Sequence, residues 1–174
     1  HNKIVTMKTI DKINKLSRSE FVEIFANIFE KTKWIAERLY NQKPFNSFED
    51  LCSKILEIFK TTSKENQLKI IRAHPDLADK TKISLLNIDS RAEQNRAGLD
   101  QCSEKEFKEF KNLNNEYKKK FGFPFILAVG DKNKAEILNK FKKRILNSVD
   151  DEFKEAISQV CKIANLRLNE INIK

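Results

Sequence analysis

Apolar side chains recur at intervals of three and four residues along most of this chain, and this spacing places them on one face of an α-helix. The pattern is clearest at residues 19–40, 47–60 and 103–117. Only 3 glycines and 3 prolines interrupt the 174 residues, which argues against a β fold with many tight turns. We therefore expect an all-α fold, a single-domain helical bundle of roughly seven to nine helices.

Boundary signals place several of these helices. We expect Ser19 and Ser47 to be N-caps, with Asp50 adding negative charge to the first turn of its helix. Further helices are expected at "KENQLKIIRA", from Ser103 to the break at Gly122, and at about 132–147 and 150–171. The run "ILAV" after the break is either extended backbone or the start of a buried turn. We expect the domain to span 7–174 and interpret residues 1–6 as a cloning remnant.

The charge pattern bears on the class of partner. The formal net charge is +9, but the lysines are interleaved with acidic residues along the whole chain. A nucleic-acid-binding protein usually concentrates its basic residues on one face or stripe. We therefore expect no nucleic-acid partner.

Cysteine spacing and apolar run length exclude other classes. The cysteines Cys52, Cys102 and Cys161 are far apart, and only one histidine lies inside the chain, so we expect no metal site. No apolar run is long enough to span a membrane, and no signal peptide is visible. The C-terminal "INIK" is not a peroxisomal Ser-Lys-Leu signal. These features lead us to expect a cytoplasmic protein with reduced thiols and no membrane association.

The single internal histidine is the first candidate functional residue. His74 can exchange protons near neutral pH, and Pro75 disfavours helical geometry at the residue before it. His74 is therefore expected where a helix ends, in a loop position of the kind that often carries function. The alternative is a structural histidine without a chemical role.

A second candidate lies at "SRAEQNRAGL". Ser90 and Glu93 have the spacing of a capping box, which is a sufficient structural explanation for both residues. A helix N-terminus is also an anion site, and the amide of Gln94 could bind a polar ligand. Either role, or both, remains open for this stretch.

The third candidate is Arg167 in the last predicted helix. Its stem lies along the apolar stripe of that helix, and a guanidinium facing a core needs a partner. Arg167 either reaches solvent, pairs with an internal carboxylate, or binds the carboxylate of a ligand through its planar fork. The sequence does not choose among these alternatives.

Several longer motifs resemble one enzyme family, the 2-oxo-4-hydroxy-4-carboxy-5-ureidoimidazoline (OHCU) decarboxylases. The resemblance covers nearly the whole chain from about residue 9. The motifs are "HPDLA" at 74–78, "SRAEQNRAGL" at 90–99, "LNNEYKKKFGFPFILAV" at 113–129 and "IANLRL" at 163–168, with "IFEKTKWIAERLYNQKPF" at 28–45 similar to the N-terminal signature.

This resemblance implies an all-helical lyase of urate degradation that forms (S)-allantoin, needs no metal or organic cofactor, and is a homodimer. It also implies that His74 is the catalytic acid–base residue and that Glu93 is its carboxylate partner. Arg167 is implied to bind substrate. The residues implied to line the pocket are Pro75, Ser90, Gln94, Phe125, Ile126, Leu127, Ala128 and Val129.

Two positions depart from the family pattern. Lys33 replaces a proline that is common before the tryptophan, and Lys43 replaces a common arginine. Both lie outside the implied site, so they bear on local packing or on substrate access. A non-catalytic family member kept as an interaction module would be expected to have lost a catalytic residue, and His74, Glu93 and Arg167 are all present.

Overall fold

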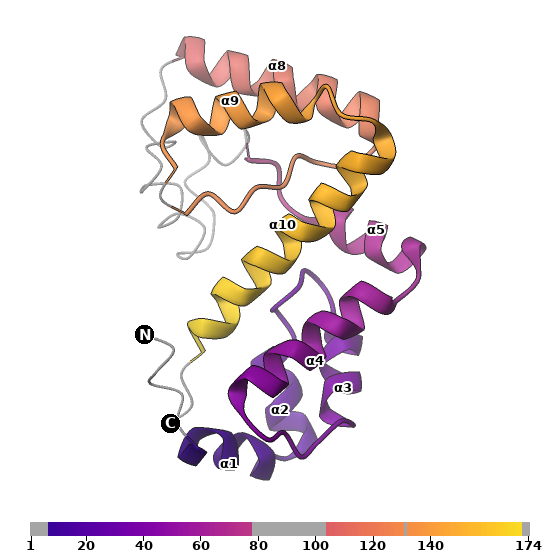
Figure 1. Cartoon of the computed structure of the whole chain (residues 1–174), viewed down its shortest axis with the longest axis vertical. Helices are drawn as coiled ribbons and strands as arrows, with labels where there is room; N and C mark the ends of the chain where they lie inside the picture. The colour runs from indigo at the N-terminus through magenta and orange to yellow at the C-terminus, as the bar shows by residue number, and fades with distance from the viewer. Residues whose placement is uncertain (1–6, 78–103, 131, 172–174) are drawn as a thin grey trace. The chain divides into compact units, whose positions relative to one another are not determined.

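The structure is a computed structural model that describes residues 7–77, 104–130 and 132–171. Within these ranges it contains eight α-helices and no β-strand (Figure 1). The expected all-α fold class is confirmed, and the helix number lies in the expected range. None of the described helices is both long enough and apolar enough to cross a membrane.

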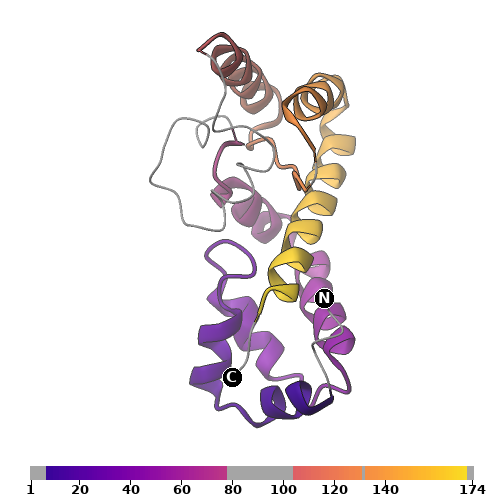
Figure 2. The same ribbon diagram turned by 90° about the vertical axis from the view of Figure 1, so that its left-hand side faces the viewer.

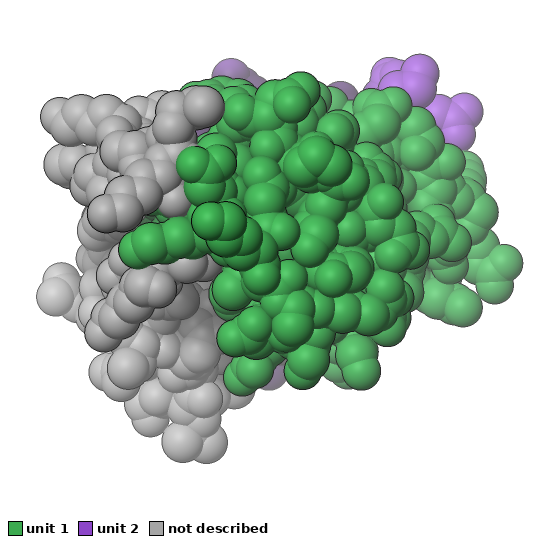
Figure 3. Space-filling view, turned by 90° about the horizontal axis from the view of Figure 1, so that it is seen from below, with its two compact units in different colours: residues 1–73, 161–174 green, residues 74–160 purple. Residues whose placement is uncertain are grey.

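The chain divides into two compact units, coloured separately in Figure 3. Unit 1 comprises residues 1–73 and 161–174, and unit 2 comprises residues 74–160. The boundary between Val160 and Cys161 falls inside the last helix, α10 (Val149–Asn169). Each unit is described by itself below.

Unit 1 is built from the N-terminal helices and the end of α10. The helices are α1 (Met7–Lys15), α2 (Arg18–Phe25), α3 (Lys33–Tyr40), α4 (Phe48–Thr61) and α5 (Lys64–Ala73). Stacked or tilted phenylalanine rings form much of its core. The ring centroids of Phe21 and Phe25 are 4.6 Å apart, and those of Phe29 and Phe59 are 4.8 Å apart. Such pairs contribute packing energy beyond the burial of area alone.

Serine side chains cap the N-termini of α2 and α4. Ser47 is the N-cap of α4, as expected, and its hydroxyl accepts a hydrogen bond from the backbone N–H of Asp50 at 3.0 Å. The prediction for α2 was wrong, because the N-cap is Ser17 and not Ser19. Ser17 and Glu20 form a reciprocal capping box that satisfies two backbone donors. Ser19 is an equally suitable residue type, but it has no glutamate three residues later and cannot form this box.

Unit 2 contains α8 (Glu104–Phe121), α9 (Lys134–Arg144) and the first part of α10. Helices α8 and α9 lie side by side (Figure 2), joined by ion pairs of Lys134 with Glu106 and of Lys142 with Glu109. Tyr117 of α8 is fully buried, and four phenylalanine rings surround it. This aromatic core supports the backbone that joins α8 to α9.

Candidate functional site

His74 lies directly after the last residue of α5, Ala73, as the proline at 75 predicted. Its ring is partly exposed, and Nδ1 lies 3.2 Å from the backbone oxygen of Pro75. A carbonyl oxygen only accepts, so this contact is a hydrogen bond when Nδ1 carries a proton. In the neutral ring, Nε2 then carries the lone pair and is the basic nitrogen.

The two residues after Pro75 fix this segment within unit 2. Lys118 of α8 donates from Nζ to the carboxylate of Asp76 at 3.1 Å, and the Asp76 side chain is only 15% exposed. Leu77 is buried. The backbone that carries His74 is therefore held by an ion pair and by an apolar contact.

The segment from Phe125 to Val129 has no helix or turn assignment and is buried except at Ala128, which is half-buried. Two side chains from the following helices bind its backbone. Arg144 donates from Nη1 to the oxygen of Ile126 at 2.6 Å, and Gln159 accepts the N–H of Ala128 at 2.9 Å. From the sequence, either extended backbone or the start of a buried turn was expected here. In the structure the segment is non-helical, and its backbone is held by the side chains of Arg144 and Gln159.

The anchor Arg144 belongs to a buried polar network. Its guanidinium forms an ion pair with Glu152 at 2.6 Å, and the side chains are 7% and 0% exposed. Tyr117 donates its hydroxyl proton to Glu152, and Asn147 donates to the other carboxylate oxygen at 3.0 Å. Burial, followed by the hydrogen bond to Glu152, raises the pKa of Tyr117 far above its ordinary value. The tyrosine therefore stays protonated at all physiological pH values and acts as a donor.

Arg167 lies in unit 1 on the last part of α10. Its Nη1 donates to the oxygen of Ile28 at 3.1 Å, and its Nη2 pairs with Glu30 at 3.0 Å. Both charged side chains are 30% exposed. Of the alternatives that the sequence left open, the structure shows the internal carboxylate partner, and these contacts hold the guanidinium in one orientation.

The expected site residues are thus distributed over three parts of the chain. His74, Pro75 and residues 125–129 lie in unit 2, whereas Arg167 lies in unit 1. Ser90, Glu93 and Gln94 lie outside the described residues, as does Cys102. A separate hollow of about 430 Å³ along α8 contains none of the expected residues; it is lined by Lys105, Lys108, Glu109, Asn112, Leu113 and Glu116.

Sequence reasoning missed Arg144, Glu152 and Gln159. Arg144 ends a run of basic residues and looks like part of a solvated surface, so only the folded structure reveals its partner. Glu152, Ala156, Gln159 and Ile163 are all buried and follow one another at steps of four, three and four residues. This helical spacing was the available signal, because polar residues in phase with a buried stripe need partners there.

Comparison with known proteins supplies the context for these residues. The profile of the family described as OHCU decarboxylase matches residues 14–169. The 2-oxo-4-hydroxy-4-carboxy-5-ureidoimidazoline decarboxylase of Haloferax volcanii is 38% identical over 162 residues, which cover 93% of this chain and 95% of that protein. A uric acid degradation bifunctional protein of Bacillus sp. (strain TB-90) is 41% identical over 165 residues. That match covers 95% of this chain but only 32% of the bifunctional protein.

Solved structures agree with the sequence comparisons. A crystal structure of OHCU decarboxylase in the presence of (S)-allantoin superposes with a TM-score of 0.67 at 25% identity, covering 83% of this chain and 93% of that one. A crystal structure of (S)-allantoin synthase superposes with a TM-score of 0.74 at 27% identity, covering 91% of this chain and 52% of that one. The profile match spans most of the chain, and the identity to the Haloferax volcanii protein extends over nearly the full length of both. This chain therefore belongs to the OHCU decarboxylase family.

Proposed function

We propose that this protein removes CO2 from 2-oxo-4-hydroxy-4-carboxy-5-ureidoimidazoline and releases (S)-allantoin. The names of the Haloferax volcanii relative and of the (S)-allantoin structure support this assignment. The observation that carries it is the position of His74, which lies at the end of α5, inside the matched family range, with Nδ1 directed to the Pro75 oxygen.

The chemistry needs little beyond orientation and one proton. The bond between the ring carbon and the carboxylate breaks, CO2 leaves, and the electron pair stays on the ring carbon. The substrate's own carbonyl and imine system delocalises that pair, so an organic cofactor is dispensable as an electron sink. The neighbouring ring carbon, which carries the ureido group, accepts a proton on one face. The hydroxyl proton of the decarboxylated carbon passes to the former imine nitrogen, and that carbon becomes the ring carbonyl. The face of protonation sets the configuration of the product.

His74 delivers this proton. In the imidazolium form Nδ1–H still donates to the Pro75 oxygen, and Nε2–H is the proton that moves to carbon. The neutral ring that remains is the tautomer protonated on Nδ1, so the Pro75 contact is kept in both states. A backbone carbonyl in this position orients the ring without requiring a second proton transfer.

The remaining expected residues bind substrate. Glu93 is proposed as the carboxylate partner of His74, and Arg167 is proposed to bind an anionic or polar group of the substrate. The contacts of Arg167 with Ile28 and Glu30 would orient its guanidinium for that purpose. We further propose a cytoplasmic homodimer with a pocket lined by Pro75, Ser90, Gln94 and residues 125–129.

Circular dichroism during turnover of freshly prepared ureidoimidazoline tests the proposal. The substrate decays unaided to racemic allantoin, so optical activity is the signal and product formation alone is not. Wild type is expected to produce an optically active (S)-allantoin signal. His74→Ala and His74→Asn are expected to lose it while keeping the helical far-ultraviolet spectrum.

His74→Asn is the sharper variant. The asparagine amide can still donate to the Pro75 oxygen but cannot titrate, so it separates proton transfer from local structure. A wild-type trace identical to the enzyme-free blank would overturn the enzyme assignment. Full activity in His74→Asn would overturn the acid–base role while leaving the reaction in place.

A further inference from the structure

We infer that Gln159 is a positioning residue for the decarboxylation, because it holds the backbone of residues 125–129 through the N–H of Ala128. The inference rests on the proposed function, in which this segment lines the substrate pocket. Neither the sequence motifs nor the comparisons point to Gln159. Its role follows from the hydrogen bonds that its side chain makes.

The orientation of the Gln159 amide is determined by its second partner. Nε2 donates to the Glu155 carboxylate at 2.7 Å, and Oε1 accepts the N–H of Ala128 at 2.9 Å. A carboxylate can only accept, so the NH2 group must face Glu155, and the oxygen must then face Ala128. Gln159 is only 6% exposed, so water does not readily replace either partner.

A second anchor acts two residues earlier. Arg144 binds the oxygen of Ile126 at 2.6 Å, and its guanidinium lies 4.3 Å from the ring centroid of Phe125. The two anchors lie two residues apart, and together they hold the backbone on both sides of Leu127. Arg144 is also tied to the core through Glu152. Among the described residues, the Gln159 side chain bonds to Ala128 and Glu155, neither of which belongs to that network.

This difference makes Gln159 the residue through which positioning can be tested. Loss of Arg144 would leave the buried carboxylate of Glu152 without its counter-charge and would destabilise the whole unit. Loss of Gln159 removes one acceptor from one backbone N–H and leaves the aromatic core in place. The Ala128 N–H would then lack its partner, and the segment would be free to shift relative to bound substrate.

The effect is expected in KM. Backbone groups that contact substrate before and during the reaction contribute uniform binding, and loss of uniform binding raises KM with little change in kcat. Gln159→Leu is therefore expected to raise KM by on the order of tenfold, the effect of losing about one hydrogen bond's worth of binding free energy. A purely structural role would lower the thermal unfolding midpoint and leave KM unchanged at temperatures well below that midpoint.

The experiment measures kcat, KM and thermal unfolding for five proteins. These are wild type, Gln159→Leu, Gln159→Asn, the double variant Glu155→Gln/Gln159→Glu, and the control Gln67→Leu. Gln159→Asn shortens the side chain by one methylene, so its amide no longer reaches the Ala128 N–H. Its KM can still be compared with that of wild type if Gln159→Leu does not fold. Gln67 is a buried glutamine that donates to the Phe59 and Lys60 oxygens in unit 1, and its loss should reduce stability with KM unchanged.

The double variant exchanges the glutamate at 155 with the glutamine at 159 and tests whether KM is restored. A carboxylate at position 159 can accept both the Ala128 N–H and the amide of a glutamine at 155, so the hydrogen bonds are kept with their donors exchanged. KM is expected to return to within about threefold of wild type. An unchanged KM in Gln159→Leu and Gln159→Asn, with lowered unfolding midpoints, would overturn the inference. A wild type without activity would instead overturn the proposed function on which it rests.

Discussion

Lys118 and Asp76 form a hydrogen-bonded ion pair that ties α8 to the backbone two residues beyond His74. The Nζ–carboxylate distance is 3.1 Å, and the aspartate is the more buried partner. The pair therefore acts at the end of the loop that presents the candidate acid–base residue.

Breaking this pair should affect turnover more than stability. Lys118→Met is expected to lower the free energy of unfolding by no more than about 1 kcal/mol, because the lysine side chain is 48% exposed and water screens the pair. It should lower kcat/KM by about tenfold, since small displacements of a catalytic group are costly. Urea unfolding and steady-state kinetics measure the two effects.

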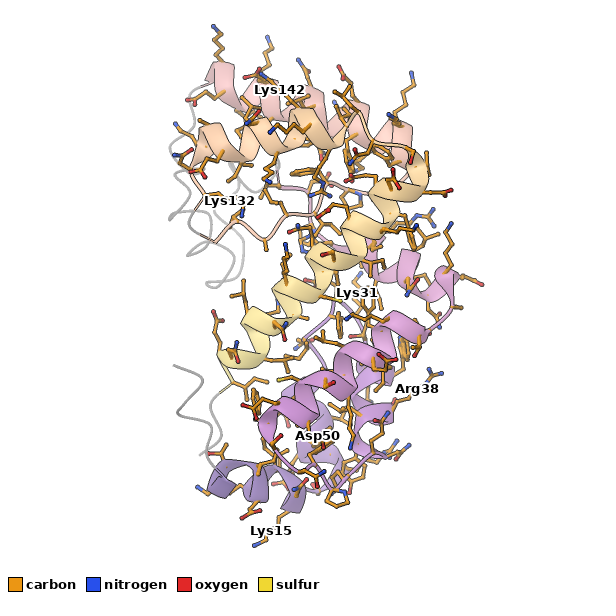
Figure 4. All side chains as sticks on the ribbon, in the orientation of Figure 1. Lys15, Lys31, Arg38, Asp50, Lys132 and Lys142 are labelled. Atoms are coloured by element: carbon orange, nitrogen blue, oxygen red, sulfur yellow. The ribbon has the colours of Figure 1, made fainter. Side chains whose placement is uncertain are left out.

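Lys142→Met provides the matched control for a lost lysine. Lys142 (labelled in Figure 4) pairs with Glu109 at 3.4 Å on the exposed surface of the same unit. Its replacement should leave kcat/KM unchanged. Equal losses of kcat/KM in the two variants would show that overall charge, and not the position of the His74 loop, is responsible.

The buried pair of Arg144 and Glu152 should dominate the stability of unit 2. Arg144→Met is expected to lower the free energy of unfolding by about 3–5 kcal/mol, because it leaves an uncompensated carboxylate in the core. The double variant Arg144→Met/Glu152→Leu should be considerably more stable than the sum of the single losses predicts. A double-mutant cycle in urea measures this coupling, and additive effects would mean that the two charges do not depend on each other.

The first turn of α4 should show a pH-dependent contribution to stability. The N–H of Asn46, followed by Lys54, lowers the pKa of Asp50 below its ordinary value of 3.8. A lowered folded-state pKa means that this stabilisation is present above about pH 4 and is lost as the pH falls through the folded-state value. Asp50→Asn should therefore lower the unfolding midpoint at pH 7, and the difference from wild type should shrink toward pH 3.

Glu23→Gln, on the exposed surface of α2, is the control for loss of a carboxylate. Its midpoint should stay close to that of wild type at both pH values. A constant gap between wild type and Asp50→Asn from pH 7 to pH 3 would contradict the charge-based explanation.

The two described cysteines should be inert thiols in the folded protein. Burial, followed by the charge of Glu49, raises the pKa of Cys52 to about 11. Burial also raises the pKa of Cys161. Since the thiolate is the reactive form, Cys52 should react with a disulfide reagent at pH 8 roughly a hundredfold more slowly than a free cysteine, and Cys161 should also react more slowly than a free cysteine.

Ellman's reagent in a Cys102→Ser background measures these two thiols alone. The slow phase should become fast after unfolding in guanidinium chloride. A fast native reaction of either thiol would mean that its helix opens locally on the timescale of the assay.

Local signals in the sequence predicted the helices well. The α5 helix covers the expected stretch, and Ser47 caps α4 as expected, because periodicity and capping depend on neighbouring residues. The choice between Ser17 and Ser19 was harder, because both are suitable caps and only Ser17 has a glutamate three residues later. That glutamate was visible in the sequence and would have decided the start of α2.

Partners that are distant in sequence were beyond local reasoning. Arg167 pairs with Glu30, 137 residues away, and Arg144 binds a backbone oxygen 18 residues away. Charge alone could not distinguish these arginines from solvated ones, because their roles arise only when distant segments pack together. The motif resemblance implied a substrate-binding role for Arg167, which stays a prediction, and gave no indication of Arg144 or Gln159.

The anchors of the segment at 125–129 all come from later in the chain. Ile126 depends on Arg144, and Ala128 depends on Gln159, which follows it by 31 residues. During synthesis this segment is therefore made before the side chains that hold it. The anchoring is completed only when α10 has left the ribosome. A nascent or truncated chain that stops just before residue 159 would contain the motifs at 74–78 and 113–129 and the Arg144 anchor. It would still lack the side chain that holds the N–H of Ala128.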